Sequence, residues 1–308
     1  MNKQKTISEI VRLWKTDKKQ YVKKSSFSAY VLLVENHLLP AFGNKHQIEE
    51  GEVQTFVFQK LEQGLSHKTV KDILIVLKMV LKFGAKNKWI EHLPFDIQFP
   101  TEREKYTIEV LSRTNQKKVM QYIQEHFTFR NIGVYICLCS GMRIGEICAL
   151  TWEDMDVDNG VINVRRTIQR IYTLDEDIRK TELILDTPKT KNSIREIPMN
   201  RDLLNIIRPI KKIVNNSFFV LTNDAKPTEP RTYRTYYKNL MKELELPELK
   251  FHGLRHSFAT RCIESKCDYK TVSVLLGHSN ISTTLNLYVH PNLEQKKKAI
   301  DQMFRGLK

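Results

Sequence analysis

The first part of the chain carries a hydrophobic pattern that predicts helices. After Ser66, a residue type that commonly caps the start of a helix, apolar side chains recur at the spacing of one helix face, at Val70, Ile73, Leu74 and Leu77. Lysines are interleaved with this stripe. Such lysines either face solvent or lie along a phosphate backbone, and the pattern alone leaves both interpretations open.

A segment of mixed polarity with two prolines, Pro94 and Pro100, follows the helical region and discourages regular structure. A chain of 308 residues is longer than one compact core usually fills, so two domains are expected. We therefore predict a helical domain over residues 1–95, a linker over residues 96–107 and a second domain over residues 108–308.

The second domain begins and ends with helical patterns. A long helix is predicted through residues 131–150, and the chain after Pro247 again has helical spacing. The last segment, residues 291–308, has apolar side chains near helical spacing. We expect this tail either to dock on a neighbouring protomer or to pack on its own domain.

Between those helical regions the pattern indicates a small sheet. The sequence Asp158-Asn159-Gly160 is a turn signal, and the β-branched run 161–164 after it predicts a strand. A second pair of strands is predicted at 183–186 and 194–198, joined by a turn that carries Lys189. The predicted fold class is therefore mainly α with a small antiparallel sheet, a helical domain followed by an α+β domain.

The charge balance points to a polyanionic partner. Fifty Lys and Arg against thirty-five Asp and Glu give a formal charge of +15, which suits nucleic acid. Eight of the first 24 residues are Lys or Arg, so the first domain is expected to act as a basic clamp. The sequence shows neither a signal peptide nor a membrane span, and we expect a cytoplasmic, nucleoid-associated protein without a membrane partner.

The cysteines favour free thiols over a disulfide framework. Their number, five, is odd, and several lie in apolar stretches, as free thiols do in a reducing compartment. One set, His252, His256, Cys262 and Cys267, has residue types that bind zinc, but it lacks a paired CxxC. We expect no metal and no cofactor.

Four short segments carry chemistry-bearing residues in a fixed order: SGMRIGE, TPKT, FHGLRH and LGHS. Each is weak alone, but their order and intervals, with a tyrosine ten positions after the last histidine, closely resemble the signature of the tyrosine recombinase (phage integrase) family. The resemblance covers residues 108 to 290, and the basic domain before it is similar to the family's core-binding, SAM-like domain. The matching positions are Arg143, Lys189, His252, Arg255, His278 and Tyr288.

The resemblance implies that a side-chain oxygen attacks a DNA phosphate, a step that builds negative charge which fixed cations stabilise. Arg143 and Arg255 are assigned to the non-bridging oxygens, because arginine stays charged and offers a fork of donors. His252, one helical turn before Arg255, either hydrogen-bonds the phosphate or accepts the proton of the attacking phenol. His278 is expected to donate to the same phosphate. Glu146, three positions after Arg143, is expected to orient that guanidinium.

Tyr288 is the nucleophile that the resemblance implies. A phenol is mostly protonated at neutral pH, so it needs nearby positive charge and a base. Lys189 is assigned by resemblance as the general acid for the leaving 5′ oxygen, with Lys191 as its rival two residues on. His256 is interpreted as a structural residue.

The resemblance also implies partners. They are double-stranded DNA core sites, a homotetramer assembled on two of them through a Holliday junction, and accessory DNA-bending or directionality factors. Integration or excision of a mobile element is the expected role. Resolution of chromosome or plasmid dimers in the manner of Xer recombinases and DNA inversion stay open as alternatives. So do a type IB topoisomerase, which reseals the same strand without partner exchange, and a catalytically idle DNA-binding protein.

Overall fold

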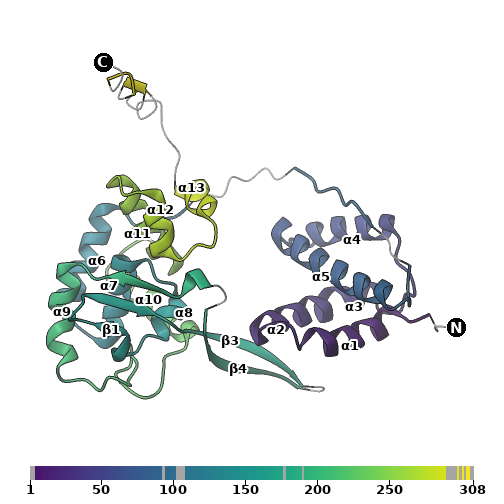
Figure 1. Ribbon diagram of the computed structural model, residues 1–308, viewed down its shortest axis with the longest axis horizontal. Coiled ribbons are helices and arrows are strands. Elements are labelled where there is room, and N and C mark those ends of the chain that lie inside the picture. Colours follow the sequence, from purple (N-terminus) through teal and green to yellow (C-terminus); the bar gives the residue numbers. More distant parts are fainter. Residues whose placement is uncertain are drawn as a thin grey trace. The chain divides into compact units, whose positions relative to one another are not determined.

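The computed structural model describes most of the chain (Figure 1). No helix among these residues combines the length and the apolar character needed to cross a bilayer. The described residues are 4–91, 94–101, 108–175, 178–188, 191–288, 297, 300–301 and 303–305.

The chain divides into two compact units. The first contains Met1–Lys105 together with Ile171–Glu182, and the second contains Tyr106–Arg170 and Leu183–Lys308. The first unit therefore includes a segment from the middle of the sequence, which a division of the chain into consecutive domains does not anticipate. Residues 102–107 of the expected linker lie outside the described residues.

The first unit is helical, as its sequence pattern predicts. The Ser66 side chain caps α5 by accepting a hydrogen bond from the Thr69 amide, and Val70, Ile73 and Leu77 of the same helix are fully buried. These residues pack with apolar residues of the preceding helices into one core. The helices are α1 (Ile7–Lys18), α2 (Lys24–Leu33), the π-helical turn η1 (Val34–Leu38), α3 (Leu39–Phe42), α4 (Glu50–Glu62) and α5 (His67–Lys86).

The core of the second unit is built around α7 (Phe129–Ser140), which is buried along almost its whole length. A helix that is apolar on all sides is stable only when other elements surround it. Helices α6 and α11 pack directly on α7, and Figure 1 shows the other helices of this unit gathered about them. The helices of this unit besides α7 are α6 (Arg113–Glu125), α8 (Ile144–Cys148), α9 (Arg201–Lys211), α10 (Pro230–Glu243), α11 (His252–Glu264), α12 (Tyr269–Leu276) and α13 (Ile281–Tyr288).

The prediction of one helix through residues 131–150 is wrong. Helix α7 ends at Ser140 because Gly141 takes the left-handed conformation, with φ of +64°, and α8 starts afresh after Arg143. Arg143 is the N-cap of α8, and its backbone amide donates to the Glu146 side chain at 2.8 Å. The break therefore places Arg143 at a corner between two helices.

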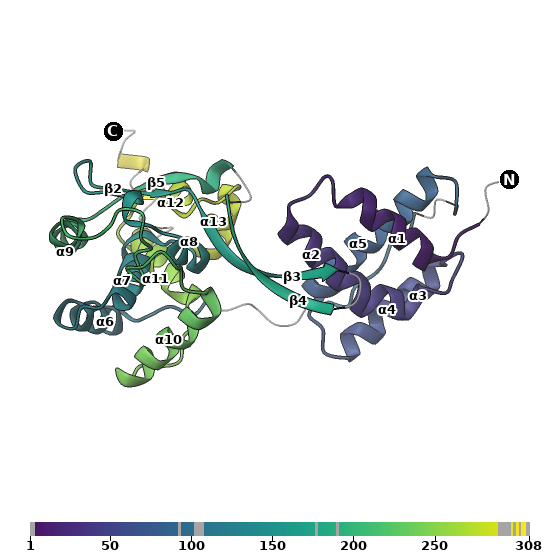
Figure 2. The same ribbon diagram turned by 90° about the horizontal axis from the view of Figure 1, so that it is seen from below.

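Two small sheets are present among the described residues. Strands β1 (Met155–Asp156), β2 (Val161–Val164) and β5 (Arg195–Pro198) form an antiparallel sheet in the order β1-β2-β5. Strands β3 (Thr167–Asp175) and β4 (Ile178–Asp186) form a separate two-stranded ribbon, visible in Figure 2.

The strand predicted at 161–164 is confirmed as β2, but the predicted pairing of 183–186 with 194–198 is wrong. The first of these segments belongs to β4 and pairs with β3, and the second pairs with β2. Ile162 faces Ile197 across that pair, and both are buried. Matching of buried faces decides the register, and no turn signal in the sequence reports it.

The left-handed corner at Gly141 yields a testable prediction. A Cβ at this position would lie 2.5 Å from Phe258 Cδ1 and 2.8 Å from Leu276 Cδ2, whereas a Cβ at Gly160, which has a similar φ of +68°, would meet Leu204 at an ordinary 3.5 Å. We expect Gly160→Ala to lose about 1–2 kcal/mol of unfolding free energy from backbone strain alone. Gly141→Ala should lose a further 1–3 kcal/mol, roughly, from overpacking. Urea unfolding of both variants measures the difference, and equal losses would contradict the packing argument.

Candidate active site

Arg255 joins the ends of three helices. It lies on α11 with only 2% of its surface exposed, and its guanidinium donates to the Gly141 carbonyl at 2.8 Å and to the Leu276 carbonyl at 2.7 Å. Those carbonyls stand at the C-terminal ends of α7 and α12, where helix carbonyls lack partners within the helix and the helix dipole is negative. The buried cation therefore finds acceptors at two helix ends.

Arg143 lies next to Arg255 because the two side chains bind neighbouring carbonyls. Its guanidinium donates to the Gly277 carbonyl at 3.1 Å and to Glu146 at 2.9 Å, while 38% of the side chain stays exposed. Gly277 has φ of +65°, the conformation that ends α12 and turns its carbonyl toward Arg143. The two arginines thus lie side by side, one buried and one open to solvent.

Arg195 on β5 is a third member of this cluster, which sequence reasoning missed. It donates to the Leu275 carbonyl at 2.7 Å, so consecutive carbonyls at the end of α12 each bind one arginine. The only signal was its phase in the strand: Arg195 and Ile197 fall on the same buried face. A charged residue on the same strand face as a buried isoleucine is expected to have a polar partner inside the fold.

Glu146 holds two of these arginines together. It is 2% exposed and accepts from Arg195 at 3.0 and 3.2 Å as well as from Arg143. Burial acts to raise the pKa of Glu146, but the hydrogen bonds and charge of Arg195, with the charge of Arg143, outweigh it and hold the pKa below its usual value. The expected orienting contact between Glu146 and Arg143 is present in this geometry, and it is shared with a buried partner.

Both predicted histidines experience the field of the arginines. Burial, followed by the charges of Arg255 and Arg143, lowers the pKa of His278 to about 4, and its Nδ1 lies 2.8 Å from Thr284 Oγ1. Burial and neighbouring groups, His256 before Arg255 and Arg143, likewise lower the pKa of His252 to about 4. Without a bound anion both rings are therefore neutral at pH 7, and a neutral imidazole has one donor and one acceptor nitrogen.

His256, predicted to be structural, is 7% exposed and packs edge to face on the His252 ring, with ring centres 4.6 Å apart. Burial, with the charge of Arg255, lowers its pKa. No group of three His, Cys, Asp or Glu side chains with the arrangement of metal ligands occurs within the described part of the chain.

A polar cavity of about 420 Å³ opens beside Arg143 and His278. Its wall also includes Thr187 and Pro188, the two residues before Lys189. Lys189 itself lies outside the described residues, and neither the Lys191 nor the Tyr288 side chain is described. Tyr288 is the last residue of α13, the helix that follows His278.

Two family models match the chain. The model of the phage integrase family matches residues 109–295, and the model of the phage integrase N-terminal SAM-like domain matches residues 6–59.

Curated relatives are similar over most of this chain. The Tyrosine recombinase XerC-like protein of Caldanaerobacter subterraneus is 28% identical over 83% of this chain and 71% of its own length. The ICEBs1 integrase of Bacillus subtilis is 24% identical over 83% of this chain and 71% of its own length. The transposase of transposon Tn916 from Enterococcus faecalis is 24% identical over 80% of this chain, which spans 64% of that relative's length.

Solved structures share the fold. The integrase of transposon Tn1549, in complex with transposon right end DNA, superposes with a TM-score of 0.78 at 22% identity, covering 97% of this chain and 99% of that one. A lambda integrase dimer bound to a core site superposes with a TM-score of 0.65 at 14% identity, covering 92% and 95%. The helical first unit and the mainly helical second unit with small sheets agree with the predicted fold class.

The shared carboxylate yields a second prediction. Glu146→Ala leaves the buried Arg195 charge without its partner, so we expect a loss of about 3–5 kcal/mol of unfolding free energy. The control is Glu153→Ala, whose side chain is 52% exposed in its ion pair with Arg166 and should change stability by less than about 1 kcal/mol. Similar losses in the two variants, measured by urea unfolding, would mean that Glu146 does not organise the site.

Proposed function

The chain belongs to the phage integrase family of tyrosine recombinases, and we propose that it is a site-specific DNA recombinase that cleaves one strand through a bond between Tyr288 and the 3′ phosphate. Enzymes of this family break and rejoin DNA. The observation that carries the proposal is the arginine cluster: two guanidiniums bind neighbouring carbonyls beside two neutral histidines, at the edge of a polar cavity.

The cluster suits the charge that develops on a phosphate under attack. As the Tyr288 oxygen bonds to phosphorus, the phosphoryl group gains negative charge, which fixed cations stabilise without having to reorganise. We assign Arg143 and Arg255 to the non-bridging oxygens. The Arg143 guanidinium is accessible to solvent. The buried Arg255 guanidinium, bound to the neighbouring Leu276 carbonyl, adds positive charge beside it. Arg195 stays on Glu146 as a positioning residue.

We assign two further roles, proton acceptance and hydrogen bonding to the phosphate, to the histidines. A neutral His252 can accept the phenolic proton as the Tyr288 oxygen attacks, and His278, held by Thr284, can donate to a phosphate oxygen. The bond between phosphorus and the 5′ oxygen then breaks, and we assign the proton that this oxygen takes up to Lys189. The reaction is reversed when a 5′ hydroxyl of the partner duplex attacks the phosphotyrosine, so neither a nucleotide cofactor nor a metal is needed.

We assign DNA binding to both parts of the chain. The proposed division is a basic core-binding domain over residues 1–95, a linker over residues 96–107 and a catalytic domain over residues 108–308. The net charge of +15 supports contacts to the phosphate backbone. The expected substrate is double-stranded DNA with core sites, bound by four protomers on two sites, with strands exchanged through a Holliday junction and with accessory bending or directionality factors.

Integration and excision of a mobile element is the role we propose, in the cytoplasm and at the nucleoid. It is supported by similarity to the ICEBs1 integrase and to the Tn916 transposase. Similarity to the XerC-like recombinase keeps dimer resolution as the second candidate. A partner-exchange assay on paired sites separates both roles from a topoisomerase, which reseals the same strand.

The nucleophile is tested by removing one oxygen. We expect Tyr288→Phe to bind DNA as the unaltered chain does and to form no covalent adduct, because no other group supplies that oxygen. The measurement uses a substrate nicked near the core site, a denaturing gel and mass analysis of the attached peptide. Tyr269→Phe, at a tyrosine 41% exposed on α12, is the control and should form adducts normally. An adduct that persists in Tyr288→Phe would overturn the assignment.

The general acid is tested by changing the leaving group. Lys189→Ala should slow cleavage of ordinary DNA by about 10²–10⁴-fold, the usual contribution of a general acid. A substrate with sulfur at the scissile 5′ position should restore most of the rate, because that leaving group needs no proton. Lys191→Ala is the matched control and should cleave both substrates nearly normally. A defect in Lys189→Ala that sulfur does not relieve assigns the proton to another group.

A further inference from the structure

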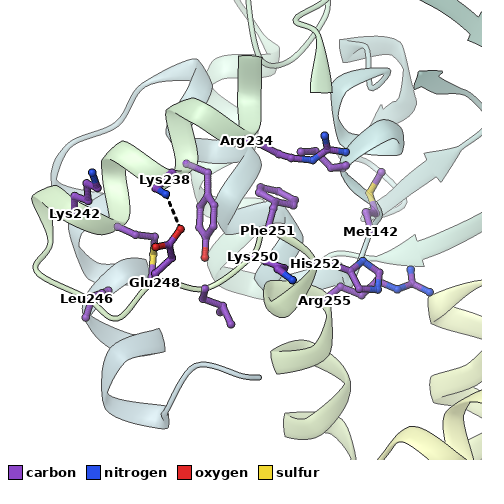
Figure 3. Close-up of a pocket in the computed structure, with 14 residues that line it drawn as sticks. Met142, Arg234, Lys238, Lys242, Leu246, Glu248, Lys250, Phe251, His252 and Arg255 are labelled. Carbon is purple, nitrogen blue, oxygen red and sulfur yellow. Dashed lines mark hydrogen bonds and ion pairs between the residues drawn. The ribbon is translucent and has the colours of Figure 1, made fainter. Parts of the chain in front are cut away.

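A second cavity, of about 430 Å³, lies in the same unit and shares His252 and Arg255 with the candidate active site. We call it the Tyr237 pocket. Figure 3 shows it between α10 and the segment that leads into α11, with His252 and Arg255 at one end and Lys242 and Leu246 at the other. Nothing in the mechanism proposed above uses this space.

The wall of the Tyr237 pocket is mainly apolar. Phe251 stands edge to face against Tyr237, with ring centres 5.2 Å apart. Apolar and aromatic walls favour a flat, weakly hydrated group. The other apolar lining residues are Met142, Ile144, Met241, Leu246 and Leu249.

One polar atom in this wall has no partner. Tyr237 is 2% exposed, and its hydroxyl is fully buried. No hydrogen-bond partner for this hydroxyl exists among the described residues. An unsatisfied buried hydroxyl destabilises the free protein, and a ligand that offers a donor or an acceptor recovers that loss. The pocket therefore fits a flat group, and an edge of that group that bonds the Tyr237 hydroxyl has to displace the atoms that cover it.

The mouth of the pocket is cationic. Arg234, Lys238, Lys242 and Lys250 line it, and Glu248 is its one carboxylate, bound to Lys238 at 2.6 Å (Figure 3). A flat group attached to phosphates matches this arrangement, because the ring can enter the apolar part while the phosphates stay at the cations.

We propose that the Tyr237 pocket holds one unpaired base of the bound DNA, next to the phosphate that is cut. The proposal rests on the proposed function, because it takes Arg255 as a cation beside that phosphate and His252 as the base that accepts the Tyr288 proton next to it. A base attached to the next sugar lies within reach of a pocket that these residues also line. Strand exchange requires base pairs beside the cut to open, and a pocket for one of the freed bases offsets part of the cost of opening.

The test measures how affinity changes when the base pair is already broken. Duplexes carry the core site mapped from the covalent adduct, and at each position beside the cut the opposite base is replaced by an abasic residue. Binding is measured in the Tyr288→Phe chain, so that cleavage does not consume the substrate. We expect one position at which the abasic partner tightens binding by at least about tenfold, or 1.4 kcal/mol, because the cost of opening has been removed.

Three variants in the same background locate the effect. Leu246→Trp fills the pocket from its rim. It should reduce the gain in affinity that the abasic partner gives to less than about twofold. Ile213→Trp adds the same ring at a residue that is 85% exposed and outside the pocket, and should keep the full gain. Tyr237→Phe removes an oxygen that has no protein partner, so the fold should be kept while the gain falls by about three- to fivefold.

The outcomes separate this proposal from the function on which it rests. If the unaltered chain forms no adduct, both proposals fall. If it forms the adduct but no position beside the cut shows the gain, or if Leu246→Trp keeps the gain, the pocket proposal alone is overturned. Equal weakening of intact and abasic duplexes by Leu246→Trp would also overturn it, because that result assigns the pocket to general DNA contact.

Discussion

The C-terminal end of α12 is the constraint on which the site depends. Three consecutive carbonyls, those of Leu275, Leu276 and Gly277, accept hydrogen bonds from Arg195, Arg255 and Arg143 respectively. A helix end concentrates partial negative charge, and it is rigid because its hydrogen bonds fix the backbone. It therefore collects guanidiniums from a strand, a helix and a helix corner that are far apart in the sequence.

This arrangement allows positive charge to accumulate without neutralising it completely. Glu146 offsets part of the charge, but the helix-end carbonyls carry no full negative charge. Burial is the main cause that lowers the pKa of both histidines, and the charges of Arg255 and Arg143 add to it. A site built only from ion pairs would hold the arginines equally well but would offer little charge to a phosphate. Two of the left-handed glycines, Gly141 and Gly277, belong to this arrangement, because each turns a terminal carbonyl toward an arginine.

Residues of the cationic cluster line two cavities of different character. The polar cavity lies on the side of Thr187 and His278, and the Tyr237 pocket lies on the side of α10. A phosphate bound at the cluster would have space for proton transfer on one side and for a flat apolar group on the other.

The sequence by itself determined the residue types and the order of the chemistry. The resemblance of Arg143, His252, Arg255 and His278 to the family signature predicted one phosphate site, because a signature depends on residue type and order. Helical spacing after Ser66 predicted α5, because that signal is local. Tertiary structure alone decided the break at Gly141, the pairing of β5 with β2 and the recruitment of Arg195. It also decided that residues 171–182 group with the first unit. Each of these depends on which distant groups come within hydrogen-bonding or packing distance, and no periodicity along the chain encodes that.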